Sequence, residues 1–280
     1  MEMIKKLNNG IEIPVIAAGM WQIPDDAAER VVRDAIEVGY KHIDTAQAYE
    51  NEAGVGRGVR ASGIKREDIF ITSKILGETV RDYDIAKQEI DDSLVRLNTD
   101  YVDLMIIHAP TPWSVMYKMD GKDYYEENAE MYRALEDAYK AGKVRAIGVS
   151  NFQINDLEYL LAHTYIKPAV NQILCNITHY PKELIDWCHA HGIDIMAFSP
   201  NATGNLKGEV IEQMAKKYGV TVPQLGNRFD IQLGAIVLPK TTHKEYLIEN
   251  LALDFEISDE DMDTLRSIGQ YTGWKGSFSE

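Results

Sequence analysis

Short apolar segments that alternate with stretches of helical periodicity constrain the fold of this chain most strongly. The eight apolar segments are residues 15–18, 42–44, 69–73, 102–107, 146–149, 169–172, 194–198 and 235–238. Between them, helical spacing of apolar residues is clearest at 26–38, 80–97, 127–141, 155–162, 181–191 and 210–218. Such alternation is typical of right-handed βαβ units on a parallel sheet. Eight units in 280 residues predict a (β/α)8 TIM barrel, because a doubly wound sheet usually has fewer strands.

Residues 4–14 precede the first unit and have the pattern of a β-hairpin. Asn9 and Gly10 separate two short strand-like pieces, and Asn-Gly is a strong signal for a two-residue turn. We expect this hairpin to plug the N-terminal mouth of the barrel. No linker rich in Pro, Gly or Ser divides the sequence, so residues 1–280 are expected to form a single barrel domain. The long irregular stretch 110–123 contains Trp113 and Tyr117, and an aromatic loop after a strand is typical of a binding wall.

Composition excludes several classes of protein. Hydrophobic residues make up 45% of the chain and are spread along it, which excludes a disordered protein, and no apolar run is long enough to span a bilayer. The net charge of −15 opposes binding to nucleic acid or to an anionic membrane. The start of the chain lacks an apolar signal segment, and two cysteines are too few for a disulfide framework. We therefore expect a cytoplasmic protein.

Polar residues stand at the predicted carboxyl ends of neighbouring strands, where barrels of this kind carry their chemistry. Asp44 ends the second strand and Tyr49 lies in the loop after it, while Lys74 and His108 end the third and fourth strands. Each residue alone has a structural explanation, such as a helix cap or a buried histidine. Four of them on adjacent strand ends favour a catalytic site.

These four side chains predict a proton donor together with groups that shift the pKa of that donor. A cation next to a phenol favours the phenolate, so Lys74 should lower the pKa of Tyr49 while Asp44 keeps Lys74 charged. Such a phenol could act as a general acid, and His108 could orient a substrate oxygen. The set contains no activated nucleophile, which argues against acyl transfer. Protonation of a carbonyl oxygen is useful when a hydride cofactor attacks the carbon.

The sequence resembles the aldo-keto reductases, a (β/α)8 family that reduces aldehydes and ketones with NADPH. The resemblance is carried by GYKHIDTAQAYENE at 39–52, FITSK at 70–74, DLMIIH at 103–108 and GKVRAIGVSNF at 142–152. It continues with VNQ at 170–172, FSP at 198–200 and LPKT at 238–241. These motifs cover essentially the whole chain in the order of the family.

The resemblance implies a role for each matching residue. Tyr49 is the general acid, Lys74 and Asp44 adjust the pKa of Tyr49, and His108 orients the carbonyl of a small-molecule substrate. Substrate-binding positions are Trp21, Tyr49, His108, Ala109 and Trp113. Cofactor-binding positions are Gly19, Met20, Asp44, Ser150, Asn151, Gln172, Phe198, Ser199, Pro200, Lys240, Thr241, Thr242, Glu249 and Asn250. The implied cofactor is NADPH, with NADH as the alternative, and because the family is often monomeric we expect a monomer.

The resemblance assigns the predicted cofactor-binding residues to different parts of the cofactor. Ser150, Asn151 and Gln172 match the residues that bond the nicotinamide carboxamide. Phe198 replaces the usual Tyr that stacks on the ring, and loss of the hydroxyl should leave stacking intact. The remaining positions, from Ser199 to Asn250, surround the pyrophosphate, the adenosine phosphate and the adenine.

Three departures from the family pattern affect the predicted site. Ala109 follows His108 where many members have Trp, which should widen the substrate pocket. The loop at 201–208 is short, so the clamp over the pyrophosphate should be reduced. Tyr246 occupies the position where NADPH-preferring members usually have Arg, and a phenol cannot hold a phosphate bidentately. Selectivity for NADPH then depends on Lys240 and its neighbours.

Two other functions are compatible with the same residues. Lys74 could form a Schiff base in an aldolase-like lyase, although Asp44 should keep it charged. The chain could also be a nicotinamide-binding barrel with a structural or regulatory role, since fold alone does not guarantee turnover.

Two further motifs do not indicate a site. The cysteines and histidines between Cys175 and His191 do not have the spacing of a zinc site, so no metal is expected. The glycine-rich stretch 54–58 has the wrong spacing for phosphate binding, and we interpret it as helix and turn.

Overall fold

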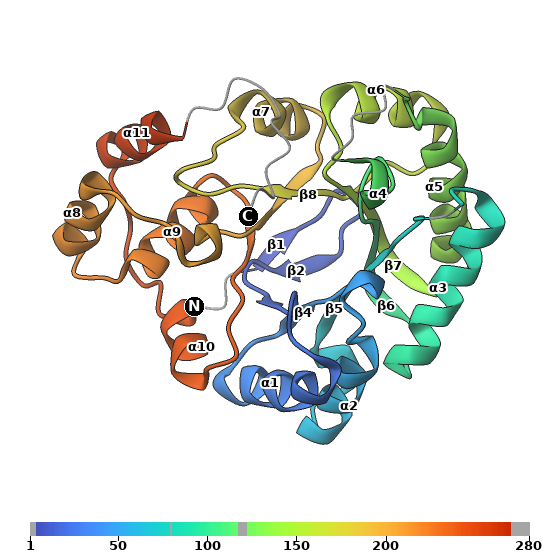
Figure 1. Ribbon diagram of the computed structural model, residues 1–280, viewed down its shortest axis with the longest axis horizontal. Coiled ribbons are helices and arrows are strands. Elements are labelled where there is room, and N and C mark those ends of the chain that lie inside the picture. Colours follow the sequence, from blue (N-terminus) through green and yellow to red (C-terminus); the bar gives the residue numbers. More distant parts are fainter. Residues whose placement is uncertain (1–3, 79, 117–121, 270–280) are drawn as a thin grey trace.

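The computed structural model describes residues 4–78, 80–116 and 122–269, and its central element is a barrel of parallel strands (Figure 1). The eight strands are β3 (Ala18–Gly19), β4 (His42–Asp44), β5 (Phe70–Ile75), β6 (Val102–Ile107), β7 (Val144–Ser150), β8 (Val170–Leu174), β9 (Asp194–Phe198) and β10 (Ile236–Leu238). They pair in chain order from β3 to β10. The barrel closes through a parallel bridge between Ile16 and Val237. Beside it, the Ala17 amide donates a 2.9 Å hydrogen bond to the Val237 carbonyl. The predicted (β/α)8 fold is confirmed.

Helices surround the strands, as Figure 1 shows. They are α1 (Asp25–Val38), α2 (Glu52–Ser62), α3 (Tyr83–Leu97), α4 (Trp113–Met116), α5 (Tyr125–Lys140), α6 (Ile154–His163), α7 (Lys182–Ala190), α8 (Glu209–Tyr218), α9 (Val222–Gln232), α10 (Lys244–Leu251) and α11 (Asp259–Ile268). Local signals set several ends: the Asp82 side chain accepts from the amide of Ile85 at the start of α3, and Gly39 ends α1 with a φ of 111°. The short 3-10 helices are η1 (Gln47–Tyr49), η2 (Arg66–Asp68) and η3 (Ala202–Gly204).

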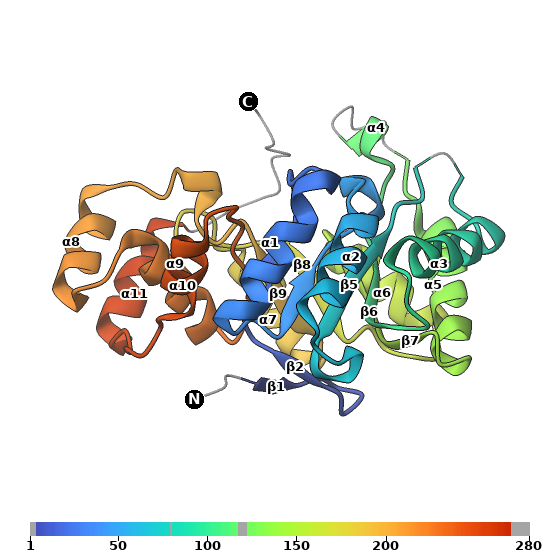
Figure 2. The same ribbon diagram turned by 90° about the horizontal axis from the view of Figure 1, so that it is seen from below.

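The predicted hairpin is present as β1 (Ile4–Lys6) and β2 (Glu12–Pro14), an antiparallel pair. Its connection is longer than the predicted two-residue turn, because Lys6 and Glu12 are the last paired residues and the Leu7 amide bonds to the Ile11 carbonyl. Buried Leu7 and Ile13 pack in one cluster with side chains from the barrel strands. In Figure 2 the hairpin lies at the end of the barrel opposite α4, which agrees with the predicted plug.

The glycine-rich stretch lies inside α2, where it permits close helix packing. A Cβ on Gly54 would overlap the carbonyl oxygen of Asp25 on α1, and one on Gly56 would overlap the carbonyl of Leu97 at the end of α3. A Cβ on Gly58 would lie 2.7 Å from the Val32 Cβ on α1. The interpretation of this stretch as helix is therefore confirmed, and its glycines serve packing.

Candidate active site

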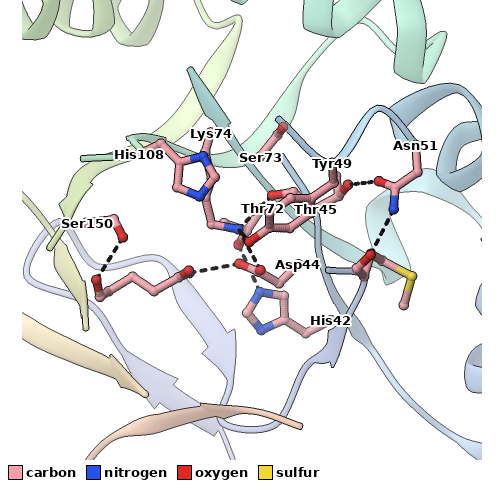
Figure 3. A network of polar contacts seen from close by, with 12 residues as sticks. His42, Asp44, Thr45, Tyr49, Asn51, Thr72, Ser73, Lys74, His108 and Ser150 are labelled. Carbon is pink, nitrogen blue, oxygen red and sulfur yellow. Dashed lines mark hydrogen bonds and ion pairs between the residues drawn. The ribbon is translucent and has the colours of Figure 1, made fainter. Parts of the chain in front are cut away.

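The predicted catalytic residues meet at the carboxyl end of the barrel because neighbouring parallel strands end at the same edge. Asp44 is the last residue of β4, Lys74 lies on β5, and His108 directly follows β6. Tyr49 ends η1, the turn after β4. Figure 3 shows the four side chains converging from these elements.

Lys74 connects the other members of the group. Its Nζ donates to Asp44 Oδ1 at 2.6 Å, to the Thr45 carbonyl at 2.8 Å and to the Tyr49 hydroxyl at 3.2 Å. The Lys74 side chain is fully buried and Asp44 nearly so. The His108 ring packs edge-on against Tyr49, with ring centroids 5.5 Å apart. The phenol therefore has an ammonium on one side and an imidazole on the other.

Burial and charge shift the pKa values of three of these groups. Burial lowers the pKa of Lys74, but the Asp44 carboxylate and Tyr49 outweigh burial, so the net pKa of Lys74 is raised. An ammonium held in this way is a poor nucleophile, which argues against the Schiff-base alternative. Burial lowers the pKa of His108 well below its usual value, and the nearby Lys74 lowers it further, so the imidazole is neutral at pH 7.

The pKa of Tyr49 departs from the sequence prediction. Burial and the nearby Asp44 carboxylate together raise it more than Lys74 lowers it, so the net pKa of Tyr49 is raised instead of lowered. Its proton is therefore retained across the physiological pH range. The positive charge of Lys74 at 3.2 Å then acts mainly by stabilising the phenolate that forms when the proton leaves.

Three amide and hydroxyl side chains lie beside this group: Ser150 ends β7, Asn151 directly follows it, and Gln172 lies on β8. Asn151 Nδ2 donates to the Ser150 hydroxyl at 2.9 Å and to the His108 carbonyl at 3.1 Å. Gln172 Nε2 donates to Asp44 Oδ2 at 2.8 Å, which extends the Lys74 network onto β8. Within the described residues, no group donates to the side-chain oxygens of Asn151 and Gln172. These two oxygens can accept bonds from an amide of a ligand.

A cavity of about 650 Å³ opens above these residues. The predicted site residues on its wall are Gly19, Trp21, Asp44, Tyr49, His108, Trp113, Ser150, Asn151, Gln172, Phe198, Ser199, Pro200 and Lys240. Most of the predicted catalytic, nicotinamide and substrate residues are thus brought together around one cavity.

Other predicted residues lie away from the cavity wall. Ala109 was expected to line the substrate pocket, but it is only 1% exposed and its carbonyl accepts from the Arg81 guanidinium at 2.7 Å. Buried Met20 and Lys74 lie behind the wall. The predicted adenosine-binding residues Thr241, Thr242, Glu249 and Asn250 lie beyond it, on α10 and the segment that precedes it. Tyr117 lies outside the described residues.

Sequence reasoning missed several residues of the wall. They are Gln22, Ala48, Leu238 and Pro239, whereas the wall residues Asn201, Thr203 and Gly204 belong to the loop 201–208 that was expected to lie over the cofactor pyrophosphate. On this wall Gln22, Thr203 and Gly204 have a positive φ, as do the predicted site residues Asn151 and Ser199. Non-glycine residues in this conformation concentrate at functional sites. Their position at or after the carboxyl ends of barrel strands was the signal available in the sequence.

Within residues 4–78, 80–116 and 122–269, no group of three or more His, Cys, Asp or Glu side chains is arranged to hold a metal ion. No helix formed by those residues has the length and apolar character needed to cross a membrane.

The chain is similar in sequence and fold to known carbonyl reductases. The chain is 42% identical to a glyoxal reductase from Bacillus subtilis (strain 168), over 95% of this chain and 92% of that protein. It is 33% identical to a methylglyoxal reductase, DkgA, from Escherichia coli (strain K12), over 95% and 93% of the two chains. The crystal structure of a Bombyx mori aldo-keto reductase in complex with NADP superposes with a TM-score of 0.85 and 31% identity, covering 95% of this chain and 92% of that one.

The family assignment follows from these matches together with the fold. The sequence model described as the Aldo/keto reductase family matches residues 15–270, which include every strand of the barrel and all four predicted catalytic residues. The protein is therefore an oxidoreductase that belongs to the aldo/keto reductase family.

Proposed function

We propose that this protein reduces small aldehydes and ketones with NADPH, with 2-oxoaldehydes as the leading substrate class and Tyr49 as the general acid. The observation that carries this proposal is the buried Lys74 ammonium, which contacts the Asp44 carboxylate and the Tyr49 phenol at 2.6 and 3.2 Å. The relatives named glyoxal reductase and methylglyoxal reductase support 2-oxoaldehydes as substrates.

The protein side chains would control the proton in this reaction. NADPH, when bound, supplies a hydride to the carbonyl carbon. The carbonyl oxygen then takes the Tyr49 proton, so that the carbonyl becomes an alcohol and Tyr49 becomes a phenolate beside Lys74. Neutral His108 can donate one N–H bond to the same oxygen and orient it. Solvent restores the phenol proton after product leaves.

The donor and acceptor set in the cavity fits a nicotinamide. The side-chain oxygens of Asn151 and Gln172 can accept from the carboxamide, and the aromatic ring of Phe198 on β9 can cover one face of the pyridine ring. At Gly19, a Cβ would approach the Leu238 carbonyl to 3.1 Å, so glycine keeps this part of the wall open. The residues present therefore fit the cofactor that the family uses.

Preference for NADPH over NADH depends on cations near the adenosine end. Tyr246 is 52% exposed and packs against His243, with ring centroids 5.5 Å apart, so it offers no guanidinium. Lys240 lies on the cavity wall. The Arg30 guanidinium of α1 donates to the Thr242 carbonyl at 3.3 Å, which brings a second cation to this loop. These two charges support NADPH.

A carbonyl panel tests the proposed function. Methylglyoxal, glyoxal, benzaldehyde and a simple ketone would be assayed with NADPH and with NADH by the loss of reduced-cofactor absorbance. We expect the 2-oxoaldehydes to have the highest kcat/KM and NADPH to exceed NADH by at least about tenfold, as one additional charge-assisted phosphate contact allows. No turnover of any carbonyl would contradict the reaction, and a higher kcat/KM with NADH would contradict the cofactor.

A further inference from the structure

Trp113 forms a wall of the cavity next to the catalytic histidine. Its ring packs edge-on against His108, with ring centroids 5.3 Å apart, and it lines the same cavity as Tyr49. Trp113 begins α4, which has only four residues and follows β6. A helix of one turn has little stability of its own. The position of this wall must therefore be fixed by contacts from other parts of the barrel.

Glu78 supplies one of these contacts from the neighbouring loop after β5. Its Oε2 accepts from the amide of Trp113 at 2.7 Å and its Oε1 accepts from the amide of Ser114 at 2.9 Å. Both carboxylate oxygens thus bond the first turn of α4. Burial raises the pKa of Glu78, but the bonds from Ser114 and Trp113 outweigh burial and lower the net pKa, so the carboxylate is charged at pH 7.

Arg81 and Asn128 hold the preceding part of the same segment. The Arg81 guanidinium donates to the Ala109 carbonyl at 2.7 Å and to Asn128 Oδ1 at 2.6 Å. Asn128 on α5 in turn donates to the Pro110 carbonyl at 2.9 Å. Arg81 is 6% exposed, so these bonds are shielded from water. Side chains from two neighbouring elements therefore bond residues 109–114 at both ends.

We propose that Glu78 is a positioning residue that sets substrate affinity by fixing Trp113 against His108. The inference rests on the proposed function for the meaning of the cavity. Glu78 does not line the cavity, so it acts through the backbone of Trp113 and not by contact with substrate. It lies apart from the nicotinamide-binding residues on β7 and β8, and cofactor affinity should not depend on it.

Replacement of Glu78 provides the test, with benzaldehyde as the probe. Glu78→Ala should raise the KM for benzaldehyde about tenfold, while kcat and the Kd for NADPH change by less than about twofold, as expected for loss of uniform substrate binding. Glu78→Gln keeps one acceptor oxygen and should give an intermediate KM.

The matched control is Glu67→Ala, which removes an exposed glutamate from η2 before β5 and should change none of these values. In a Trp113→Ala background, Glu78→Ala should change KM by less than about twofold, because coupled residues are not additive.

Two measurements that need no turnover separate this inference from the proposed function. Hydrogen exchange at the Trp113 and Ser114 amides should be at least about tenfold faster in Glu78→Ala than in Glu67→Ala, since both bonds are lost. The Kd of benzaldehyde for the NADP⁺-loaded protein should rise with KM. Three results would each overturn the inference. They are unchanged hydrogen exchange in Glu78→Ala, an unchanged Kd of benzaldehyde, and an equal change of KM on Glu78→Ala with and without Trp113. A wild-type protein that binds benzaldehyde but reduces no carbonyl would overturn only the proposed function.

Discussion

At the scale of single residues, the site depends on a charge that is buried and paired at the same time. Lys74 is fully buried, yet Asp44, the Thr45 carbonyl and Tyr49 accept its three ammonium protons. An unpaired ammonium in this position would lose its proton. The pairing therefore keeps a positive charge within 3.2 Å of the phenol oxygen, where negative charge would develop as Tyr49 gives up its proton.

The shifted pKa values predict how activity depends on pH. The pKa of His108 is lowered by burial and by Lys74, so the imidazole gains a proton only well below its usual range. The pKa of Tyr49 is raised, chiefly by burial, so the phenol loses its proton only above its usual range. Both protonation states are then constant from about pH 6 to pH 9, and kcat/KM should be flat across that range.

A pH profile with saturating NADPH checks this expectation. An inflection of kcat/KM near pH 6.5 that is absent in His108→Asn would show that His108 titrates at its ordinary value. Such a result would contradict the neutral imidazole required by the proposed role.

The clustering of the predicted site residues could be inferred from the sequence, whereas the environment of each side chain could not. Asp44, Lys74 and His108 could be placed together because the carboxyl ends of adjacent parallel strands share one edge. The direction of the Tyr49 pKa shift could not be predicted, because burial and Asp44 raise this pKa while Lys74 lowers it, and the extent of burial depends on packing. The burial of Ala109 away from the wall has the same origin, since the bond from Arg81 to its carbonyl joins residues distant in sequence.

At the scale of elements, α2 is fixed between α1 and α3 by its glycines. Gly54 and Gly58 contact α1, and Gly56 contacts the end of α3. The carbonyl of Leu97 is part of the backbone and cannot move aside easily. Gly56→Ala should therefore lower the free energy of unfolding by about 1–3 kcal/mol or more, as overpacking does, although alanine is the better helix former.

Urea unfolding of Gly56→Ala measures this cost. Ala61→Ser lies on the exposed side of the same helix and should change stability by less than about 0.5 kcal/mol. The Kd for NADPH of folded Gly56→Ala should match the wild-type value, because these glycines serve packing and not phosphate binding. A stable variant with impaired NADPH binding would reverse that assignment.

Element types were more predictable than their ends and connections. Each apolar run contains or overlaps a strand of the barrel, and all six predicted helices are present. The hairpin loop differs from the Asn-Gly prediction because pairing stops at Lys6 and Glu12, which leaves Asn9 and Gly10 inside a longer loop. α9 and α10 were not predicted, although a capping box at Thr221 and Gln224 marks the start of α9.

At the scale of the whole molecule, one buried acid makes stability depend on pH. Asp230 on α9 is fully buried; its Oδ1 accepts from the Cys175 thiol, and its Oδ2 has no bond to the described residues. Burial raises the pKa of Asp230 well above its ordinary value, although the Cys175 bond lowers it in part. The folded protein thus keeps a proton that the unfolded chain releases above about pH 4. Stability contributed by this group is lost as pH rises from there.

Asp230→Asn should remove this pH dependence. The amide keeps an acceptor for Cys175 and cannot ionise, so we expect the variant to gain stability relative to wild type, with a larger gain at pH 8 than at pH 5. The gain at pH 8 should be about 1–3 kcal/mol, the usual cost of a poorly satisfied buried polar group. Urea unfolding at the two pH values checks this, with exposed Asp254→Asn as the control. A difference that shrinks as pH rises would contradict the assigned protonation state.

The barrel as a whole could be predicted from the number and spacing of its segments, but the cavity could not. Eight alternating units leave few other parallel architectures, and the net charge of −15 implies that a phosphorylated cofactor is held by local donors. The cavity wall includes loop residues such as Gln22 and Thr203, whose backbone conformation is set by tertiary contacts. Local sequence preferences carry little information about such positions.

The most direct test of the account is single replacement of the Tyr49 hydroxyl. Tyr49→Phe should lower kcat/KM for methylglyoxal by about 10²–10⁴-fold, the usual contribution of a general acid, while the Kd for NADPH, measured by fluorescence, stays within about twofold of wild type. Tyr165→Phe, at a tyrosine that is 90% exposed, should leave both values unchanged. If Tyr49→Phe reduces methylglyoxal at a rate close to that of the wild type, Tyr49 is not the proton donor and the central claim is wrong.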